Sequence, residues 1–128
     1  MIMAAALCGC GGNDASEPMI TKQEIKVENG HFTPEIMHQL GKVGDPQLSP
    51  DGSRILYGVT YTSIEQNKGN RELYVMNLDG SNNVKITSTP KSESNARWIS
   101  DSQIVYMRGG KLYTATLSGT TLSAEAEV

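Results

Sequence analysis

The chain has 128 residues, with 11 Lys and Arg against 14 Asp and Glu, so its net charge is −3. This balance carries no basic excess that would favour a nucleic-acid partner. A hydrophobic share of 38% permits a core, and two cysteines exclude a disulfide framework. The composition favours one small β-rich domain rather than a self-contained enzyme.

Residues 1–10 form an apolar run that is too short to span a bilayer as a helix. Its end, Leu7-Cys8-Gly9-Cys10, resembles the bacterial lipobox. The resemblance implies that residues 1–10 include a lipoprotein signal, that Cys10 carries the lipid, and that the protein is anchored to a membrane of the cell envelope. A metal or redox pair formed by Cys8 and Cys10 is an alternative, but neither histidine has ligand spacing to them. An inert leader is another alternative.

Residues 11–30 are expected to be a polar tether followed by a short strand, marked by Ile20, Ile25 and Val27. Residues 31–44 are expected to form an entry helix. Thr33 suits the N-cap and Pro34 the first helical position, and Gly41 suits the C-terminal end. The two histidines, His31 and His38, are expected to be ordinary residues of this segment.

A first β unit is predicted over residues 45–90, with strands at 47–49, 54–61, 73–76 and 84–87. Period-two apolar positions support the second strand, and the third is apolar on both faces, which predicts cover on both sides. Polar turn residues separate the strands, and the turn-forming positions are Ser49, Pro50, Asp51, Gly52, Asp79 and Gly80.

The pattern restarts in residues 91–128. Asp101 follows Asp51 at an offset of 50, and Tyr106 follows Tyr57 at an offset of 49. Gly109 and Gly110 predict a two-residue hairpin. No closing strand is expected after residue 117. A β unit that repeats every 40 to 50 residues is typical of propeller blades, so the predicted fold is all-β, with about 1.75 four-stranded antiparallel blades.

The Ser-Pro-Asp-Gly turn at 49–52 with its aromatic-bearing strand, and residues 73–80, resemble the repeat of TolB-type propellers. The same repeat builds the N-terminal propeller of the prolyl oligopeptidase family of serine peptidases. Residues 33–37 and 44–52 resemble the entry segment of bacterial dipeptidyl- and acylaminoacyl-peptidases in that family. The resemblance implies a C-terminal α/β-hydrolase domain, which would carry a Gly-x-Ser-x-Gly motif that this chain lacks.

The resulting hypothesis is an N-terminal propeller fragment of a lipid-anchored serine peptidase that hydrolyses peptides. Its partners would be the remaining blades, the hydrolase domain, peptide substrates and the membrane. No catalytic, cofactor-binding or metal-binding residue is assigned in this chain. Two alternatives stay open, a non-catalytic TolB-like propeller that binds envelope proteins and a complete small lipoprotein.

Two groups of residues have a structural and a functional interpretation. Asp51 and Asp101 could ligate a metal or act as an acid/base pair, but aspartates in tight turns usually accept hydrogen bonds from nearby backbone. The aromatic residues could form a stacking platform, but at matched repeat positions they are expected to pack between blades. They are Tyr57, Tyr74, Trp98, Tyr106 and Tyr113.

Overall fold

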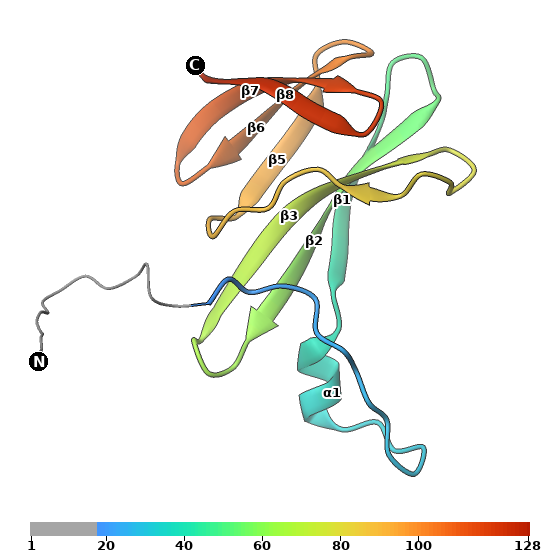
Figure 1. Ribbon diagram of the computed structural model, residues 1–128, viewed down its shortest axis with the longest axis vertical. Helices are drawn as coiled ribbons and strands as arrows, with labels where there is room; N and C mark the ends of the chain where they lie inside the picture. The colour runs from blue at the N-terminus through green and yellow to red at the C-terminus, as the bar shows by residue number, and fades with distance from the viewer. Residues whose placement is uncertain (1–17) are drawn as a thin grey trace, which may run out of the picture.

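The computed structural model describes residues 18–128, in which eight strands follow one short helix (Figure 1). The helix is α1 (Pro34–Gln39). The strands are β1 (Lys42–Leu48), β2 (Arg54–Ser63), β3 (Lys68–Asn77), β4 (Val84–Lys85), β5 (Glu93–Trp98), β6 (Gln103–Arg108), β7 (Lys111–Ser118) and β8 (Thr121–Glu127). They form two four-stranded antiparallel sheets, in the orders β1-β2-β3-β4 and β5-β6-β7-β8. The all-β prediction is confirmed.

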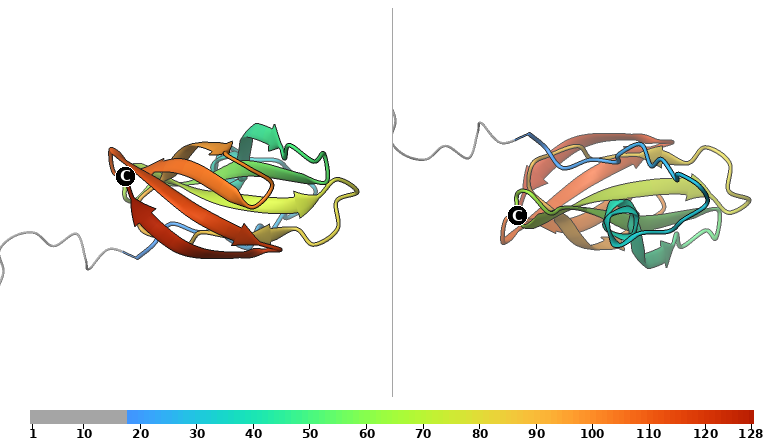
Figure 2. Two further views of the ribbon diagram at one scale, coloured as in Figure 1. Left: turned by 90° about the horizontal axis from the view of Figure 1, so that it is seen from above. Right: turned by 90° about the horizontal axis from the view of Figure 1, so that it is seen from below.

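The core lies between the two sheets. In the view from above in Figure 2, the second sheet lies in front of the first. Side chains alternate between the faces of a strand, so each sheet turns one set of residues toward the other sheet. The buried cluster between them contains Leu56, Leu73, Ala96, Ile104, Tyr106 and Ala115.

The middle of β3 is covered on one face. Leu73 and Val75 are each 1% exposed, whereas Tyr74 and Met76 on the opposite face are half-buried. The prediction that this strand is covered on both sides is therefore met on the side that faces the second sheet and only partly on the other.

The two sheets repeat each other in detail. Tyr57 stacks on Tyr74 with ring centroids 5.5 Å apart, and Tyr106 stacks on Tyr113 at 6.0 Å. The Tyr57 hydroxyl donates to Asn83, and the Tyr106 hydroxyl donates to Glu125. In both sheets the second strand thus contacts the third through a tyrosine pair. The tyrosine hydroxyl reaches the residue just before β4 in the first sheet and a residue of β8 in the second.

The first strand of each sheet also has a bulge at the same repeat position. The register shifts between Gly44 and Gln47 in β1 and between Ser94 and Arg97 in β5. Asp45 (φ 55°) and Asn95 (φ 53°) adopt left-handed backbone there, a conformation that Asp and Asn tolerate better than most residues. The offset of 50 between them matches the offset of the turn aspartates.

The N-terminal segment differs from the prediction in two ways. No strand forms over residues 18–33, and the helix is limited to Pro34–Gln39 within the predicted 31–44. Ile20 is nevertheless buried, and the carbonyl oxygen of Pro18 accepts from Gln66 Nε2 at 3.0 Å. Ile20 is thus buried without strand pairing, whereas Val27 is 53% exposed.

The helix ends early because Leu40 already has extended backbone (φ −69°, ψ 137°). Gly41 then passes close to the first sheet, where an added Cβ would lie 2.8 Å from the side chains of Val59 and Tyr61. Residues 42–44, predicted to end the helix segment, begin β1 instead. The glycine at this position is needed for close approach rather than for a helix C-cap.

The prediction of an incomplete second unit is wrong. β8 pairs with β7 through Ser118↔Thr121, Leu117↔Leu122 and Thr114↔Ala126, which gives the second sheet its fourth strand. β8 consists mainly of small and acidic residues and is mostly exposed, so it lacks the apolar alternation by which a strand is found in sequence. Similarly, β3 spans Lys68–Asn77 and begins well before the strand predicted at 73–76.

Candidate functional site

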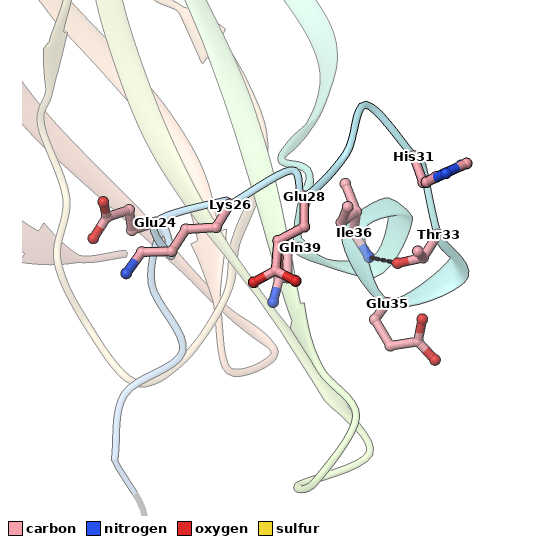
Figure 3. A pocket seen from close by; sticks show the side chains of 8 residues that line it. All are labelled: Glu24, Lys26, Glu28, His31, Thr33, Glu35, Ile36 and Gln39. Atoms are coloured by element: carbon pink, nitrogen blue, oxygen red, sulfur yellow. Dashed lines mark hydrogen bonds between the residues drawn. The ribbon is translucent and has the colours of Figure 1, made fainter.

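The structure has a shallow hollow of about 470 Å³ beside α1 (Figure 3). Glu28 and Gln39 both line it, whereas His31 and Glu35 point away from them in this view. The Thr33 hydroxyl is used as the helix cap, accepting from the Ile36 N–H at 3.3 Å. The acidic side chains of this hollow do not converge on one point, so it offers no arrangement for catalysis.

A buried polar cluster at the junction of the two sheets is the strongest candidate site. Its charged members come from four strands, with Glu72 on β3, Glu93 on β5, Arg108 on β6 and Glu125 on β8. Glu72 is 3% exposed and Glu93 is 0% exposed. Carboxylates are seldom buried to this degree without partners, so the hydrogen bonds of each decide what the cluster can do.

Glu72 receives three hydrogen bonds. Asn70 Nδ2 donates to its Oε1 at 3.0 Å, and the Thr89 backbone N–H donates to the same oxygen at 2.9 Å. The Thr87 hydroxyl donates to Oε2 at 2.7 Å. The side-chain oxygen of Asn70, Oδ1, is buried without a partner. Every donor to Glu72 is neutral, and together they suit a carboxylate.

Glu93 has fewer partners although it is more deeply buried. The Thr89 hydroxyl and Arg108 Nε both donate to its Oε1, at 2.7 and 2.5 Å, while Oε2 is buried and has no partner. Burial raises the pKa of Glu93 above its usual value, and the neighbouring Glu72 carboxyl raises it further against the opposing effect of Thr89 and Arg108. Thr89 joins the two glutamates, because its N–H serves one and its hydroxyl the other.

Arg108 closes the outer side of the cluster. Its Nη1 and Nη2 donate to the two oxygens of Glu125 at 2.5 and 2.9 Å. Its guanidinium also lies over the rings of Tyr106 and Tyr113, at 5.5 and 5.1 Å from their centroids. The contact with Arg108 lowers the pKa of Glu125, and burial together with Glu125 raises the pKa of Tyr106.

The cluster joins the two sheets and contains no nucleophile with a base. Within residues 18–128 no group of three or more His, Cys, Asp and Glu side chains could hold a metal ion. In the same residues, no helix is long and apolar enough to cross a membrane. The geometry therefore describes an internal polar junction rather than an open active site.

The turn residues singled out from the sequence lie far from this cluster. Asp51 Oδ1 accepts from Ser49 Oγ, Ser53 N and Ser53 Oγ at 2.6, 3.0 and 2.8 Å. The Gly52 N–H donates to the Ser49 carbonyl at 2.9 Å. Asp79 accepts similarly from the N–H and hydroxyl of Ser81. Both side chains are occupied within their own turns.

The remaining predicted residues take separate places. Asp101 is exposed in the β5–β6 turn, and its carbonyl oxygen accepts from Arg54. Gly109 (φ 59°) and Gly110 (φ 81°) connect β6 to β7. The lipidation candidate Cys10 lies outside the described residues, as does the rest of segment 1–17.

Sequence reasoning missed the glutamate pair. Glu72 and Glu93 are 21 positions apart, so no short sequence motif links them. One signal was available, since Glu72 lies two positions before Tyr74 and four before Met76, on the same face of the strand as these apolar residues. Nothing in the sequence of β5 indicated that Glu93 would meet it.

The chain is similar in sequence to two proteins that share one name. The chain is 34% identical over 114 residues to dipeptidyl-peptidase 5 of Porphyromonas gingivalis, which covers 87% of this chain and 16% of that protein. It is 29% identical over 106 residues to dipeptidyl-peptidase 5 of Porphyromonas endodontalis, covering 82% of this chain and 15% of that protein. No family model matches, and no solved structure matches. These relatives support a dipeptidyl-peptidase-like family. The chain spans only 15–16% of the length of the two relatives.

Proposed function

We propose that this chain is the N-terminal part of the β-propeller of an exported serine peptidase of the prolyl oligopeptidase family, and that the whole protein releases dipeptides from the N-termini of peptides. The observation that carries the proposal is the similarity to two dipeptidyl-peptidases 5 over more than four fifths of the chain. The polar junction between the sheets would then be part of the scaffold, and the chemistry would belong to a hydrolase domain elsewhere in the protein.

The exposure of equivalent residues supports the propeller. Leu78 and Leu117 occupy matching positions, because their N–H groups donate to the carbonyls of Ser53 and Ser102 at 2.9 and 2.7 Å. Leu117 is 1% exposed against the first sheet, whereas Leu78 is 60% exposed. The second sheet therefore buries this face against the first sheet, whereas the equivalent face of the first sheet leaves Leu78 exposed.

Two more apolar residues lie on this outward face of the first sheet. Val43 pairs with Val59 and is 68% exposed, and Leu48 pairs with Ile55 and is 57% exposed. An apolar sheet face of this kind is usually covered by another element. We propose that a further blade of the longer protein covers it, as the first sheet covers the second.

The proposal is tested on the longer protein. The coding sequence should continue beyond codon 128 and encode a Gly-x-Ser-x-Gly motif, and the purified protein should release dipeptides from unblocked peptide substrates. Changing the serine of that motif to alanine should abolish release, whereas N-terminally acetylated peptides should resist cleavage. A reading frame that closes after the propeller, without a hydrolase domain, would favour the TolB-like binding protein instead.

The proposed lipid anchor on Cys10 rests on the order Leu7-Cys8-Gly9-Cys10. Membrane attachment and a cell-envelope location follow from it. In cells fed a labelled fatty acid, Cys10→Ser should abolish labelling of the protein and its partition into detergent. Cys8→Ser is the matched control, because a small residue is retained two positions before the modified cysteine and labelling should continue. Equal labelling of both variants would exclude this anchor.

A further inference from the structure

The charges of the sheet junction do not balance. Three carboxyl groups, those of Glu72, Glu93 and Glu125, meet one guanidinium, that of Arg108. Glu125 takes two of its N–H groups and Glu93 takes only the Nε–H. If every carboxyl were ionised, the junction would hold two uncompensated negative charges, one of them on a fully buried side chain. Burying an unpaired charge is among the most costly arrangements in a protein.

The hydrogen bonds indicate which carboxyl is neutral. Both oxygens of Glu72 accept from donors, which suits the ionised form. Glu93 Oε2 has no donor, although the side chain is 0% exposed. A buried acceptor without a partner is destabilising, whereas a protonated Oε2 becomes a donor itself. The neighbouring acceptor is the Glu72 carboxylate, because Thr89 contacts both glutamates, with its N–H 2.9 Å from Glu72 Oε1 and its hydroxyl 2.7 Å from Glu93 Oε1.

We propose that Glu72 and Glu93 share one proton at neutral pH, with Glu93 as the carboxylic acid donating through Oε2 to the Glu72 carboxylate, and that this proton stabilises the packing of the two sheets. The pair joins β3 of the first sheet to β5 of the second. It is an internal proton-binding site, and it does not depend on the peptidase assignment.

The groups that contact the pair come from several elements. Asn70, Thr87 and Thr89 supply neutral donors to it. Arg108 on β6 is the cation in contact with it, and that cation is shared with Glu125 on β8. The Tyr106 hydroxyl donates to Glu125, and the Lys91 side chain lies beside Gly109, in the hairpin that follows Arg108.

The proton makes stability depend on pH in an unusual direction. The pKa of Glu93 is raised in the folded chain from its usual value of 4.5. At a pH between the pKa values of the unfolded and the folded chain, only the folded chain holds this proton. The stability that the proton contributes is therefore complete below the unfolded pKa and is lost as pH rises through the folded pKa. Carboxyls with lowered pKa values, such as Glu65 and Glu125, act in the opposite direction.

Urea unfolding of the full chain between pH 5 and pH 8.5 tests this inference. Over the titration range of the pair, the unfolding equilibrium constant of the wild type should rise with pH by up to tenfold per unit, the limit for one proton. Glu93→Gln should remove that rise, because the amide is neutral at every pH and keeps a donor toward Glu72. Glu65→Gln is the matched control, an exposed carboxyl outside the junction, and should keep the wild-type rise.

A spectroscopic measurement accompanies the unfolding series. With ¹³C-labelled glutamate side chains, one carboxyl carbon should have the chemical shift of a protonated carboxylic acid at pH 7 in the wild type and in Glu65→Gln. This signal should be missing in Glu93→Gln. Titration of every glutamate carbon near its ordinary pKa would overturn the proposal, as would an equal pH slope in wild type and Glu93→Gln. Failure of Glu93→Gln to fold would also contradict it, because glutamine reproduces the size, neutrality and donor of the acid.

Discussion

The turn aspartates illustrate how much a single residue can be understood from its neighbours. Asp51 accepts three hydrogen bonds from serines within two positions of it. These bonds need only the local chain, so the sequence pattern was sufficient to favour a turn former over a metal ligand.

Asp51 should contribute stability that depends on acid pH. The hydroxyls of Ser49 and Ser53 are the main cause that lowers its pKa from the usual 3.8 to about 2. The unfolded chain therefore binds a proton first, and this contribution is present above pH 4 and lost as pH falls toward 2. Asp51→Asn should lower the urea midpoint at pH 7 and weaken the acid dependence. Equal pH profiles for wild type and variant would contradict the role.

Ala124 has a backbone conformation that its own residue type does not favour. It adopts a φ of 51° in β8, where the register with β7 shifts between Thr114 and Thr116. An L-residue with a Cβ pays roughly 1–2 kcal/mol in left-handed backbone, and glycine does not.

Ala124→Gly should therefore raise the free energy of unfolding by about 1 kcal/mol. Ala126→Gly, in the same strand but at a regularly paired position, should lower it by roughly 0.5–1 kcal/mol because glycine is unfavourable inside strands. Thermal and urea unfolding of the two variants measure the difference. A loss of stability in both would mean that the strain at Ala124 is not relieved.

At the scale of elements, strands with an alternating apolar face were found and strands held by other means were not. β2 has apolar positions with period two, and the strand predicted at 54–61 lies within the observed Arg54–Ser63. β8 is held by backbone pairing with β7 and by Glu125, whose carboxyl reaches Arg108 and Tyr106. A glutamate in an exposed strand resembles any surface residue until its partners are known.

The two glutamates of β8 should therefore differ in importance. Glu125→Gln should lower the free energy of unfolding by roughly 1 kcal/mol, because it breaks a two-pronged ion pair with the half-buried Arg108. Glu127→Gln breaks an exposed ion pair with Lys111, whose N–O distance is 3.1 Å, and should have a smaller effect. Urea unfolding at pH 7 in low and moderate salt compares them. A larger loss for Glu127→Gln would refute this ranking.

At the scale of the whole molecule, the two sheets are related by a repeat but are not equally covered. The position of Leu117 is buried between the sheets, whereas the matching Leu78 faces outward. The difference arises because the second sheet packs on the first and, within the described residues, no sheet packs on the opposite face of the first.

Because the two sheets are unequally covered, a leucine-to-serine substitution should lower the free energy of unfolding by different amounts at two matched positions. Leu117→Ser should lower the free energy of unfolding of this chain by about 3 kcal/mol or more, through lost burial and a buried hydroxyl. Leu78→Ser should change it by less than about 0.5 kcal/mol. In the longer protein, Leu78→Ser should become clearly destabilising if a further blade covers that face. An unchanged small effect there would argue against the propeller.

The sequence by itself determined the fold class, the repeat, the turns at 49–52 and 109–110, and the strands whose apolar positions alternate. These features depend on local backbone preferences and on periodic patterns, both of which are written in neighbouring residues. Only the tertiary structure decided that β8 closes the second sheet, that residues 18–33 pack without forming a strand, and that Glu72 meets Glu93. Those outcomes depend on which faces come together across the two sheets, because a carboxyl or an exposed strand acquires its role only from distant partners.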